Sequence, residues 1–405
     1  MKIGIDLRAL QTGHKFRGIG EVAKQTTNRI IALASKNSDI SFIFYEYSDD
    51  DPKELLTIPK NVSYEIVKLG LMPENDVSAR KRDKIQRHLK DFYGHPIKDS
   101  NKSDIFLQFD YAFGVPKDTK TLLIKHDLIP YVFWDKYFES ALVPFRNKAL
   151  RTTLRTLFAN YKFMRVLRRS LKNAHVIIAV SHSTKKDIEK FFDVDPTKTK
   201  VAHLGVDIKP AKTTGHVSAG VMPSKPYMLF VGAGDARRRV DDAVDAFNNL
   251  KADGHDIQLV LVGENFKSPE QIPNLKVRNA VMGSSYKKDI LTLGYVDDTT
   301  KQKLYKEAIA FVYPTKYEGF GIPVLEAMLL ECPIITYKNS SIPEVGGDHA
   351  IYAKNWQDIQ TEVAKLLKMS PADREKLTRA AKTHAEQFTW DKTAQVIYQE
   401  LMDNK

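Results

Sequence analysis

Short apolar segments that alternate with longer segments of helical period are the feature that most limits how this chain can fold. The apolar segments read KIGID, DIFLQF, TLLIKH, HVIIAVS, YMLFVG, IQLVLVG, AIAFVYP and CPIITY. Several are apolar without interruption, which is typical of parallel strands that helices cover on both faces. The pattern therefore predicts an α/β protein built from βαβ units and doubly wound sheets.

The length of the chain predicts two domains. Its 405 residues exceed what one ordinary hydrophobic core accommodates. The stretch from Gly205 to Pro226 is rich in Gly, Pro, Ser and Thr and shows little periodicity, which is typical of a linker. A new apolar segment begins at Tyr227. We therefore predict domains at 1–205 and 227–385, joined by a linker at 206–226.

Composition is that of a globular protein from a reducing compartment. Hydrophobic residues make up 42% and charged residues 28% of the sequence. The single cysteine, Cys332, excludes an internal disulfide and a cysteine-only metal site. The opening MKIGIDLRAL lacks a signal-peptide core, and no apolar run approaches the roughly 18 residues of a membrane span. We expect a cytoplasmic protein, either soluble or peripheral at the inner face of the plasma membrane.

The formal net charge of +12 comes entirely from the first half of the chain. Residues 1–200 hold 36 Lys or Arg and 24 Asp or Glu, and the remainder is balanced. Basic surfaces attract nucleic acid, anionic lipid or phosphorylated substrates, and the sign of the charge does not choose among them. A nucleic-acid partner is not expected, because the sequence has no recognisable nucleic-acid-binding module.

The segment from Pro144 to Lys172 concentrates this charge. It contains no acid and nine basic residues, which are Arg146, Lys148, Arg151, Arg155, Lys162, Arg165, Arg168, Arg169 and Lys172. Five large apolar residues fall on one helical face, namely Leu150, Leu154, Leu157, Phe158 and Tyr161. Two interpretations remain open. The segment is an amphipathic helix with this face in the core, or it binds an anionic membrane surface or acceptor.

The most informative motif is YEGFGIPVLEAM at residues 317–328, in which seven residues separate Glu318 from Glu326. Glycine followed by proline in a first helical turn indicates a strand-to-helix junction, with the helix beginning at about Pro323. A carboxylate on each side of this junction can accept hydrogen bonds from sugar and ribose hydroxyls.

The backbone of the same junction is suited to an anionic ligand. We expect the N–H groups of Val324 and Leu325 to be free at the helix start, where the dipole favours an anion such as a pyrophosphate. The Gly319-Phe320-Gly321 backbone can approach that ligand closely. The competing interpretation is an ordinary strand-to-helix turn with two surface acids.

This motif resembles the E-x7-E signature of family 4 glycosyltransferases, which have the GT-B fold. The resemblance implies two Rossmann-like domains facing an interdomain cleft, with the acceptor on the N-terminal domain and the nucleotide sugar on the C-terminal domain. It also implies that Glu318 lies by the transferred sugar and that Glu326 holds the ribose of the nucleotide.

The sequence FVGAGDARRR at residues 230–239 ends a strand with a glycine-rich turn that includes Gly232. It resembles the family's turn ending in proline-arginine-lysine, whose cations grip the donor diphosphate. The match places Arg237 and Arg238 in those roles, although Ala236 stands where the family has proline and Arg238 where it has lysine. Cations facing a leaving diphosphate neutralise charge that develops as the glycosidic bond breaks. The alternative is a solvated basic helix start.

Two N-terminal motifs complete the predicted site. TLLIKHDLIP at residues 121–130 places His126 just past an apolar strand, where ligands gather in open α/β sheets. It resembles the family's strand-end histidine, which implies contact with the donor sugar; a structural histidine is the alternative. KFRGIGE at residues 15–21 places Gly18 and Gly20 in a loop that, as in the resembled family, we assign to the acceptor and the diphosphate. A hairpin-like turn is the competing interpretation.

Further segments extend the resemblance over nearly the whole chain. LGYVDD at 293–298 resembles the strand and turn near the base, which implies a donor-binding role for Tyr295. FTWD at 388–391 resembles the start of the last helix, 386–405, which in this fold crosses back to the first domain. The resemblance is strongest from Tyr227 onward and weakest in residues 45–100.

The predicted function is hexosyl transfer with retention at the anomeric carbon. No motif suggests a metal or a cofactor, so we expect cationic side chains and a helix start to do the work that Mg²⁺ often does. HDLIP and NSSIPE (339–344) look most like bacterial mannosyltransferases for surface polysaccharides, which favours GDP-mannose as donor and a saccharide or lipid-linked saccharide as acceptor. A UDP-hexose donor and a non-catalytic partner protein of the same fold remain open.

Overall fold

A computed structural model describes residues 1–12, 18–48, 51–70, 97, 99, 102–109, 115–133, 150–208 and 222–405. The chain divides into two compact units. Unit 1 comprises Met1–Gly205 together with Trp390–Lys405, and unit 2 comprises Val206–Thr389. The chain therefore leaves unit 1 after Gly205 and returns to it at Trp390.

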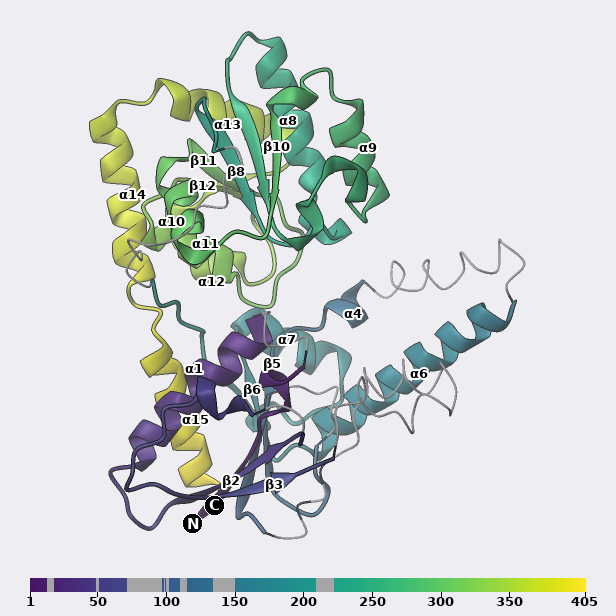
Figure 1. The fold of residues 1–405 in the computed structure, drawn as a ribbon, viewed down its shortest axis with the longest axis vertical. Coiled ribbons are helices and arrows are strands. Elements are labelled where there is room, and N and C mark those ends of the chain that lie inside the picture. The colour runs from purple at the N-terminus through teal and green to yellow at the C-terminus, as the bar shows by residue number, and fades with distance from the viewer. Residues whose placement is uncertain are drawn as a thin grey trace. The chain divides into compact units, whose positions relative to one another are not determined.

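Unit 1 is built on a parallel sheet (Figure 1). In the described part of the chain, its strands lie in the order β3 (Ser63–Lys68), β2 (Ser41–Glu46), β1 (Lys2–Asp6), β4 (Ile105–Gln108), β5 (Thr121–Lys125), β6 (Val176–Ala179) and β7 (Thr199–Val201). Each neighbouring pair runs parallel. Because the order reverses direction between β1 and β4, a topological switch point lies between these two strands.

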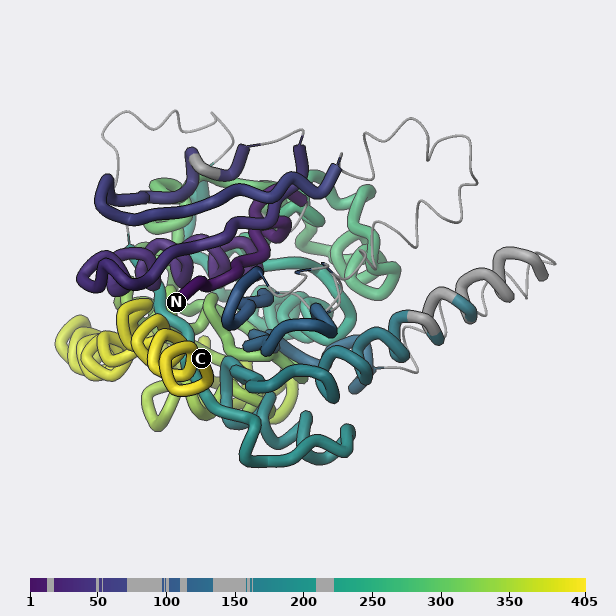
Figure 2. The backbone as a smooth tube through the Cα atoms, turned by 90° about the horizontal axis from the view of Figure 1, so that it is seen from below, coloured from purple at the N-terminus to yellow at the C-terminus, as the bar shows by residue number. Residues whose placement is uncertain are grey.

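Helices cover the sheet of unit 1. They are α1 (Gly18–Ala34), α4 (Ile129–Val132), α6 (Leu150–Asn173), α7 (His182–Phe191) and α15 (Trp390–Asp403). The last of these packs beside α1, although the two are far apart in the sequence (Figure 2). Arg29 Nε lies 2.7 Å from Asp391 Oδ1, and Thr393 Oγ1 donates to the His203 carbonyl at 2.6 Å. Trp390 and Ile397 are buried in this contact layer.

Two residues of the apolar face that the sequence predicts on α6 are exposed to solvent. Phe158 and Tyr161 are 60% and 61% exposed. The C-terminal part of α6 lies against the sheet (Figure 1), and the side chains buried there are Phe163, Met164, Leu167 and Leu171. This stripe lies on a different side of the helix from Phe158 and Tyr161, so the core interpretation is wrong for these two residues. The side chains of the other three residues of the predicted face, Leu150, Leu154 and Leu157, are not among those described. Residues 134–149 lie outside the described residues.

Unit 2 contains a second parallel sheet. Its described strands lie in the order β10 (Ile290–Gly294), β9 (Gln258–Val262), β8 (Tyr227–Val231), β11 (Ala310–Tyr313), β12 (Ile334–Tyr337) and β13 (Ile351–Ala353). All of these pairs are parallel. The order reverses between β8 and β11, which places the switch point of unit 2 there.

The helices of unit 2 are α8 (Val240–Ala252), α9 (Leu275–Gly283), α10 (Asp298–Glu307), α11 (Ile322–Leu329), α12 (Ile342–Gly346), α13 (Trp356–Lys368) and α14 (Pro371–Ala385). Several begin where a polar side chain caps the free backbone N–H groups of the first turn. Asp297 accepts from Thr300 N, Asn355 from Asp358 N and Ser370 from Asp373 N.

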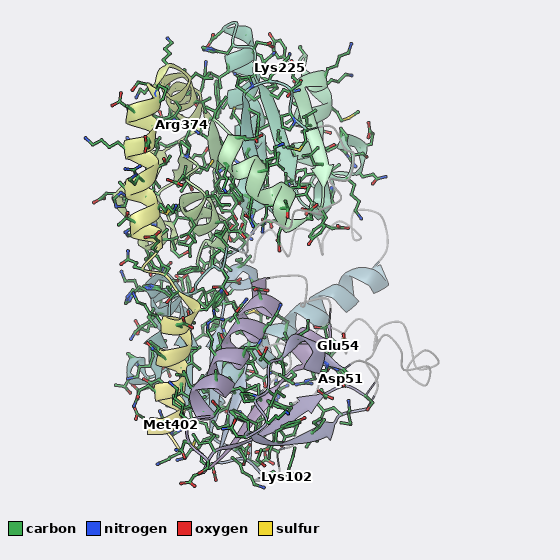
Figure 3. The ribbon with its side chains drawn as sticks, turned by 60° about the vertical axis from the view of Figure 1, so that its left-hand side comes forward. Asp51, Glu54, Lys102, Lys225, Arg374 and Met402 are labelled. Carbon is green, nitrogen blue, oxygen red and sulfur yellow. The ribbon has the colours of Figure 1, made fainter. Side chains whose placement is uncertain are left out.

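Polar contacts also fix the ends of unit 2 elements that lie away from the site. Lys225 Nζ, just before β8, lies 2.8 Å from Asp256 and 3.1 Å from Asp289, which precede β9 and β10 (Figure 3). These ion pairs join the N-terminal ends of three neighbouring strands. On α14, Arg374 donates to the carbonyls of Ala308 and Ile309, just past the end of α10.

The predicted fold class is confirmed. Both units are parallel α/β structures with a Rossmann-like strand order. No helix in the described ranges combines the length and apolarity needed to cross a bilayer.

The packing of α15 on unit 1 predicts a contrast between neighbouring residues. Ile397 is 1% exposed and Val396 is 37% exposed. We expect Ile397→Ala to lower the free energy of unfolding by about 2–5 kcal/mol, because it leaves a cavity. Val396→Ala is the matched control and should change it by about 0.5 kcal/mol or less. Urea denaturation measures both, and equal effects would contradict the placement of α15.

Candidate functional site

Several of the predicted site residues, among them Arg237, Arg238 and Glu318, gather at the C-terminal ends of β8 and β11, the switch point of unit 2. The short helix η6 (Ala236–Arg238) follows β8 and carries Arg237 and Arg238. The loop after β11 carries Glu318. Residues about 80 positions apart meet here because the carboxyl ends of parallel strands share one edge of the sheet, where ligands of open α/β sheets bind.

Glu318 accepts four hydrogen bonds through one oxygen. Arg237 and Arg238 both pair with Oε1, the latter through Nε at 2.9 Å. The Tyr313 hydroxyl lies 2.6 Å and Thr315 Oγ1 lies 3.2 Å from the same oxygen. Among the described residues, no donor lies within hydrogen-bond distance of Oε2. The second oxygen is thus available to a ligand.

The two arginines keep Glu318 ionised. Its side chain is 9% exposed, and burial alone would raise its pKa. Arg238, Arg237 and the hydrogen bond from Tyr313 outweigh burial and lower the pKa to about 2. Burial also disfavours charge on Arg238, but Glu318 raises the pKa of Arg238 above its ordinary value. At neutral pH the two guanidinium groups and Glu318 carry two positive charges and one negative charge. A second carboxylate, that of the partly exposed Asp235, lies 3.2 Å from Arg237 Nε and 4.0 Å from Arg238 NH1.

Arg237 and Arg238 are not a solvated basic helix start. Their side chains are 11% and 14% exposed. Arg237 also donates to the Tyr317 carbonyl at 2.8 Å, and the Arg238 guanidinium lies 5.6 Å from the centre of the Tyr313 ring. A Cβ atom at Gly232 would lie 2.9 Å from Arg238 NH1, so glycine leaves room for the arginine.

Arg239 belongs to a different cluster. It adopts φ 43° at the junction between η6 and α8, a left-handed conformation that a side chain rarely takes. Its guanidinium pairs with Asp241 and Asp242 in the first turn of α8. The geometry thus separates Arg239 from the pair that faces Glu318.

A serine clasp, Ser340 and Ser341, holds the backbone of the loop around Glu318. Ser340 Oγ accepts from Glu318 N at 2.9 Å. Ser341 Oγ lies 2.9 Å from the Glu318 carbonyl and 2.7 Å from the Phe320 carbonyl, and it donates to them. Phe320, predicted beside the donor, is 4% exposed and packs edge-on against Phe388. The sequence NSSIPE gave no sign of this role because the clasp depends on β12 lying next to β11.

The start of α11 differs from the prediction. The N–H groups of Val324 and Leu325 donate to the Gly321 carbonyl at 2.9 and 3.2 Å, so the expectation that they are free was wrong. The reason is that Gly321, at φ 116°, is the N-cap, and the helix begins at Ile322, one residue earlier than expected. Donor binding by Val324 and Leu325 stays a prediction, but free N–H groups no longer support it.

Glu326 is held by two side chains of α10. Lys301 Nζ lies 2.9 Å from Oε1, and the Tyr305 hydroxyl lies 3.3 Å from Oε2. Burial lowers the pKa of Lys301, but Glu326 and Asp298 outweigh it and raise that pKa above its ordinary value. Nothing in the sequence analysis pointed to Lys301 or Tyr305. Residue type alone does not show which lysine of a basic helix turns inward.

The loop after β10 exposes an aromatic ring. Tyr295 is 77% exposed and follows Gly294, which has φ 63°. Gly319 and Gly232 lie in the loops after β11 and β8, as the sequence predicts, and their roles stay predictions.

The predicted residues of unit 1 lie at the corresponding edge of its own sheet. His126 follows β5, and its Nε2 lies 3.0 Å from the Phe109 carbonyl just after β4. Gly18 and Gly20 lie in the first turn of α1 and not in a loop, a correction to the prediction. Residues 13–17 lie outside the described residues.

A buried charged group at the switch point of unit 1 escaped the sequence analysis. Arg8 is 3% exposed, and its Nε and NH2 lie 2.9 and 2.7 Å from the two oxygens of Asp6. Gln108 at the end of β4 donates to Asp6 at 2.6 Å. The only signal in the sequence is that the acid ending the strand KIGID, Asp6, is followed two residues later by a base, Arg8.

Two family models match the chain over most of its length. The model described as Glycosyltransferase Family 4 matches residues 22–209, and the one described as Glycosyl transferases group 1 matches residues 214–384. Together they include the switch point of unit 2 and every described strand of unit 1 except β1.

Similar proteins carry glycosyltransferase names. O-antigen chain mannosyltransferase B of Escherichia coli is 29% identical over 57% of this chain and 61% of its own length. The serotype-specific mannosyltransferase WbdA of Escherichia coli is 21% identical over 97% of this chain and 47% of its own length. The chain thus spans about half to three fifths of these relatives. The structure of HepE from Anabaena, in complex with UDP and glucose, covers 100% of both chains with a TM-score of 0.62 at 14% identity.

The low pKa of Glu318 predicts how the free energy of unfolding depends on pH in the acid range. A carboxyl whose pKa falls on folding stabilises the fold above its ordinary value of 4.5, and this stabilisation is lost as the pH falls toward 2. We expect this group to contribute about 3 kcal/mol to the fall in the free energy of unfolding. Glu318→Gln should lack that part of the fall, as urea denaturation at stepped pH would show. Glu375→Gln, in an exposed ion pair on α14, should keep that part of the fall. The same dependence of the free energy of unfolding on pH in wild type and in both variants would contradict the coupling of Glu318 to the two arginines.

Proposed function

Because the chain belongs to glycosyltransferase family 4, with the GT-B fold, we propose that it transfers a hexose from a nucleotide sugar to a hydroxyl group of a saccharide acceptor. The observation that carries the proposal is the convergence of Arg237 and Arg238 on Glu318 at the switch point of unit 2. Two largely buried cations at a strand-end site suit a diphosphate, and a carboxylate with one open oxygen suits a sugar hydroxyl.

The charges match a leaving nucleoside diphosphate. As the bond between the anomeric carbon and the phosphate oxygen breaks, negative charge develops on the diphosphate. The guanidinium groups of Arg237 and Arg238 are fixed in a poorly solvated position, so they would stabilise that charge without reorganisation. We propose that they supply the positive charge that Mg²⁺ supplies in other transferases, and that the reaction needs no metal or cofactor.

We propose retention of configuration by front-face attack. The acceptor hydroxyl oxygen bonds to the anomeric carbon on the face that the diphosphate leaves, and the hydroxyl proton passes to the leaving phosphate oxygen. Glu318 is ionised at neutral pH and has no proton to donate, so its role would be to accept a hydrogen bond from a hydroxyl of the transferred sugar. His126 in unit 1 is the proposed further contact to that sugar.

GDP-mannose is the proposed donor. Two relatives of this chain are named mannosyltransferases, one of O-antigen chains and one serotype-specific. Their names support mannose as the transferred sugar. The proposed acceptor is a saccharide or a lipid-linked saccharide of cell-surface glycan synthesis. A UDP-hexose is the other donor that the sequence leaves open.

Helix α6 supports a peripheral location at an anionic membrane surface. Phe158 and Tyr161 are exposed on the helix side that also carries the exposed basic residues Arg165, Arg168, Arg169 and Lys172. Aromatic rings with flanking cations suit the headgroup region of an anionic bilayer. This face would bring unit 1 to a membrane that holds a lipid-linked acceptor.

A ligand-stability panel tests the donor site. We expect one nucleoside diphosphate among GDP, UDP and ADP, and its hexose conjugate, to stabilise the protein by about 2.7 kcal/mol at 100 times its dissociation constant. Arg238→Met should abolish this stabilisation because it removes a diphosphate contact. Arg239→Met removes the neighbouring cation, which pairs with Asp241 and Asp242, and should keep it.

Each result of the panel has a defined meaning. Stabilisation by GDP and GDP-mannose would support the proposed donor, and stabilisation by UDP conjugates alone would replace it. The absence of any response would favour a non-catalytic protein of the same fold. Transfer to an acceptor that persists in excess EDTA would support the metal-independent reaction.

The exposed face of α6 predicts binding to anionic vesicles. We expect the protein to co-sediment with phosphatidylglycerol vesicles at low salt and not with phosphatidylcholine vesicles. The Arg165→Glu/Arg168→Glu variant should bind about tenfold more weakly or worse, since each basic residue near such a surface contributes about 1 kcal/mol. Lys186→Glu/Lys200→Glu makes the same charge change at exposed positions elsewhere in unit 1 and is the control. An equal loss in both variants would show that net charge alone drives binding.

A further inference from the structure

Lysines of α10 lie in two different environments. Lys303 and Lys306 are exposed to solvent, as expected for a polar helix. The Lys301 side chain is 25% exposed and turns toward Glu326, whose side chain is 15% exposed. Placing an ammonium in this position costs solvation free energy unless partners compensate, and the partners are Glu326 at 2.9 Å and, more distantly, Asp298 at 3.6 Å.

Two side chains of one helix, α10, contact the two carboxylate oxygens of Glu326. Lys301 Nζ donates to Oε1 at 2.9 Å, and the Tyr305 hydroxyl contacts Oε2 at 3.3 Å. Tyr305 is fully buried, which fixes its hydroxyl. Helix α10 begins just after the end of β10, where Asp297 caps it by accepting from Thr300 N at 2.8 Å. The two donors are thus anchored to the strand that precedes Tyr295.

We propose that Lys301 and Tyr305 are positioning residues that orient the Glu326 carboxylate toward the vicinal diol of a ribose. The inference rests on the proposed function, in which this site binds a nucleotide sugar. It adds two residues of α10 that set how tightly the ribose is held.

The hydrogen-bonding capacity of a carboxylate supports this role. An ionised carboxylate has about four lone-pair directions, two on each oxygen. Lys301 uses one on Oε1 and Tyr305 uses one on Oε2, which leaves one on each oxygen. Two neighbouring hydroxyl donors, such as the 2′- and 3′-hydroxyls of ribose, can use these two remaining lone-pair directions. The ammonium also stops the carboxylate from rotating to satisfy itself in another direction.

Binding of ribose and deoxyribose nucleotides tests the proposal. The probes are GDP and UDP with their 2′-deoxy and 3′-deoxy forms, titrated calorimetrically into the full chain. Wild type should prefer the ribonucleotide over a deoxy form. Lys301→Met should weaken ribonucleotide binding about tenfold, as expected for loss of a charged hydrogen-bond partner, and should leave the deoxy forms nearly unaffected. The preference for ribose would therefore shrink.

The control variants separate positioning from a general structural role. Lys303→Met, on the exposed side of the same helix, should keep the wild-type preference. Glu326→Ala should lose it entirely. Tyr305→Phe removes the second contact, together with a 3.5 Å contact from the same hydroxyl to the Pro323 carbonyl. It tests the proposal even if Lys301→Met folds poorly, and it should also reduce the preference. A merely structural role of Lys301 would lower the melting temperature and weaken ribose and deoxyribose ligands alike.

The remaining results are also decisive. A wild-type ribose preference in Lys301→Met and Tyr305→Phe, together with its loss in Glu326→Ala, would overturn this inference and leave the donor site intact. Failure of wild type to bind either nucleotide would overturn the proposed donor site and this inference with it.

Discussion

The buried charge of Glu318 is the constraint on which the functional edge of unit 2 depends. A carboxylate that is 9% exposed must be compensated, and Arg237 and Arg238 do so through a single oxygen. Much of the local structure serves this arrangement. Glycine at position 232 leaves room for Arg238, and the serine clasp of Ser340 and Ser341 holds the backbone on which Glu318 sits. The result is a preformed group of charges with one carboxylate oxygen open to a ligand.

The parallel topology explains why these residues meet. The arginines follow β8 and Glu318 follows β11, and these strands are neighbours at the point where the strand order reverses. Glu326 lies one helix further along and takes its partners from α10. Two carboxylates are thus held by cations from two different elements. Two separately held carboxylates suit a ligand with a diphosphate, a sugar and a ribose, since each part of such a ligand needs a different contact.

Much of this was predictable because it depends on local sequence. Uninterrupted apolar strands and helical periods predicted two doubly wound sheets, and the motifs at 230–239 and 317–328 identified the residues that gather at the switch point. Other features escaped prediction because they depend on distant partners. The serine clasp requires β12 beside β11, and the inward turn of Lys301 requires Glu326. On α6, helical period alone placed Phe158 and Tyr161 on the core face, whereas the described side chains of this helix that pack in the core begin at Phe163.

By itself, the sequence determined the fold class and the chemical groups of the candidate site, since strand burial, helix period and turn residues act over a few neighbouring positions. Only the tertiary structure decided which partner each charge has. Arg237, Arg238 and Arg239 are consecutive and chemically identical, yet two face Glu318 and the third faces Asp241 and Asp242. The left-handed backbone at Arg239 and the position of β11 decide which partner each arginine meets. Both features depend on interactions between parts of the unit that are far apart in the sequence.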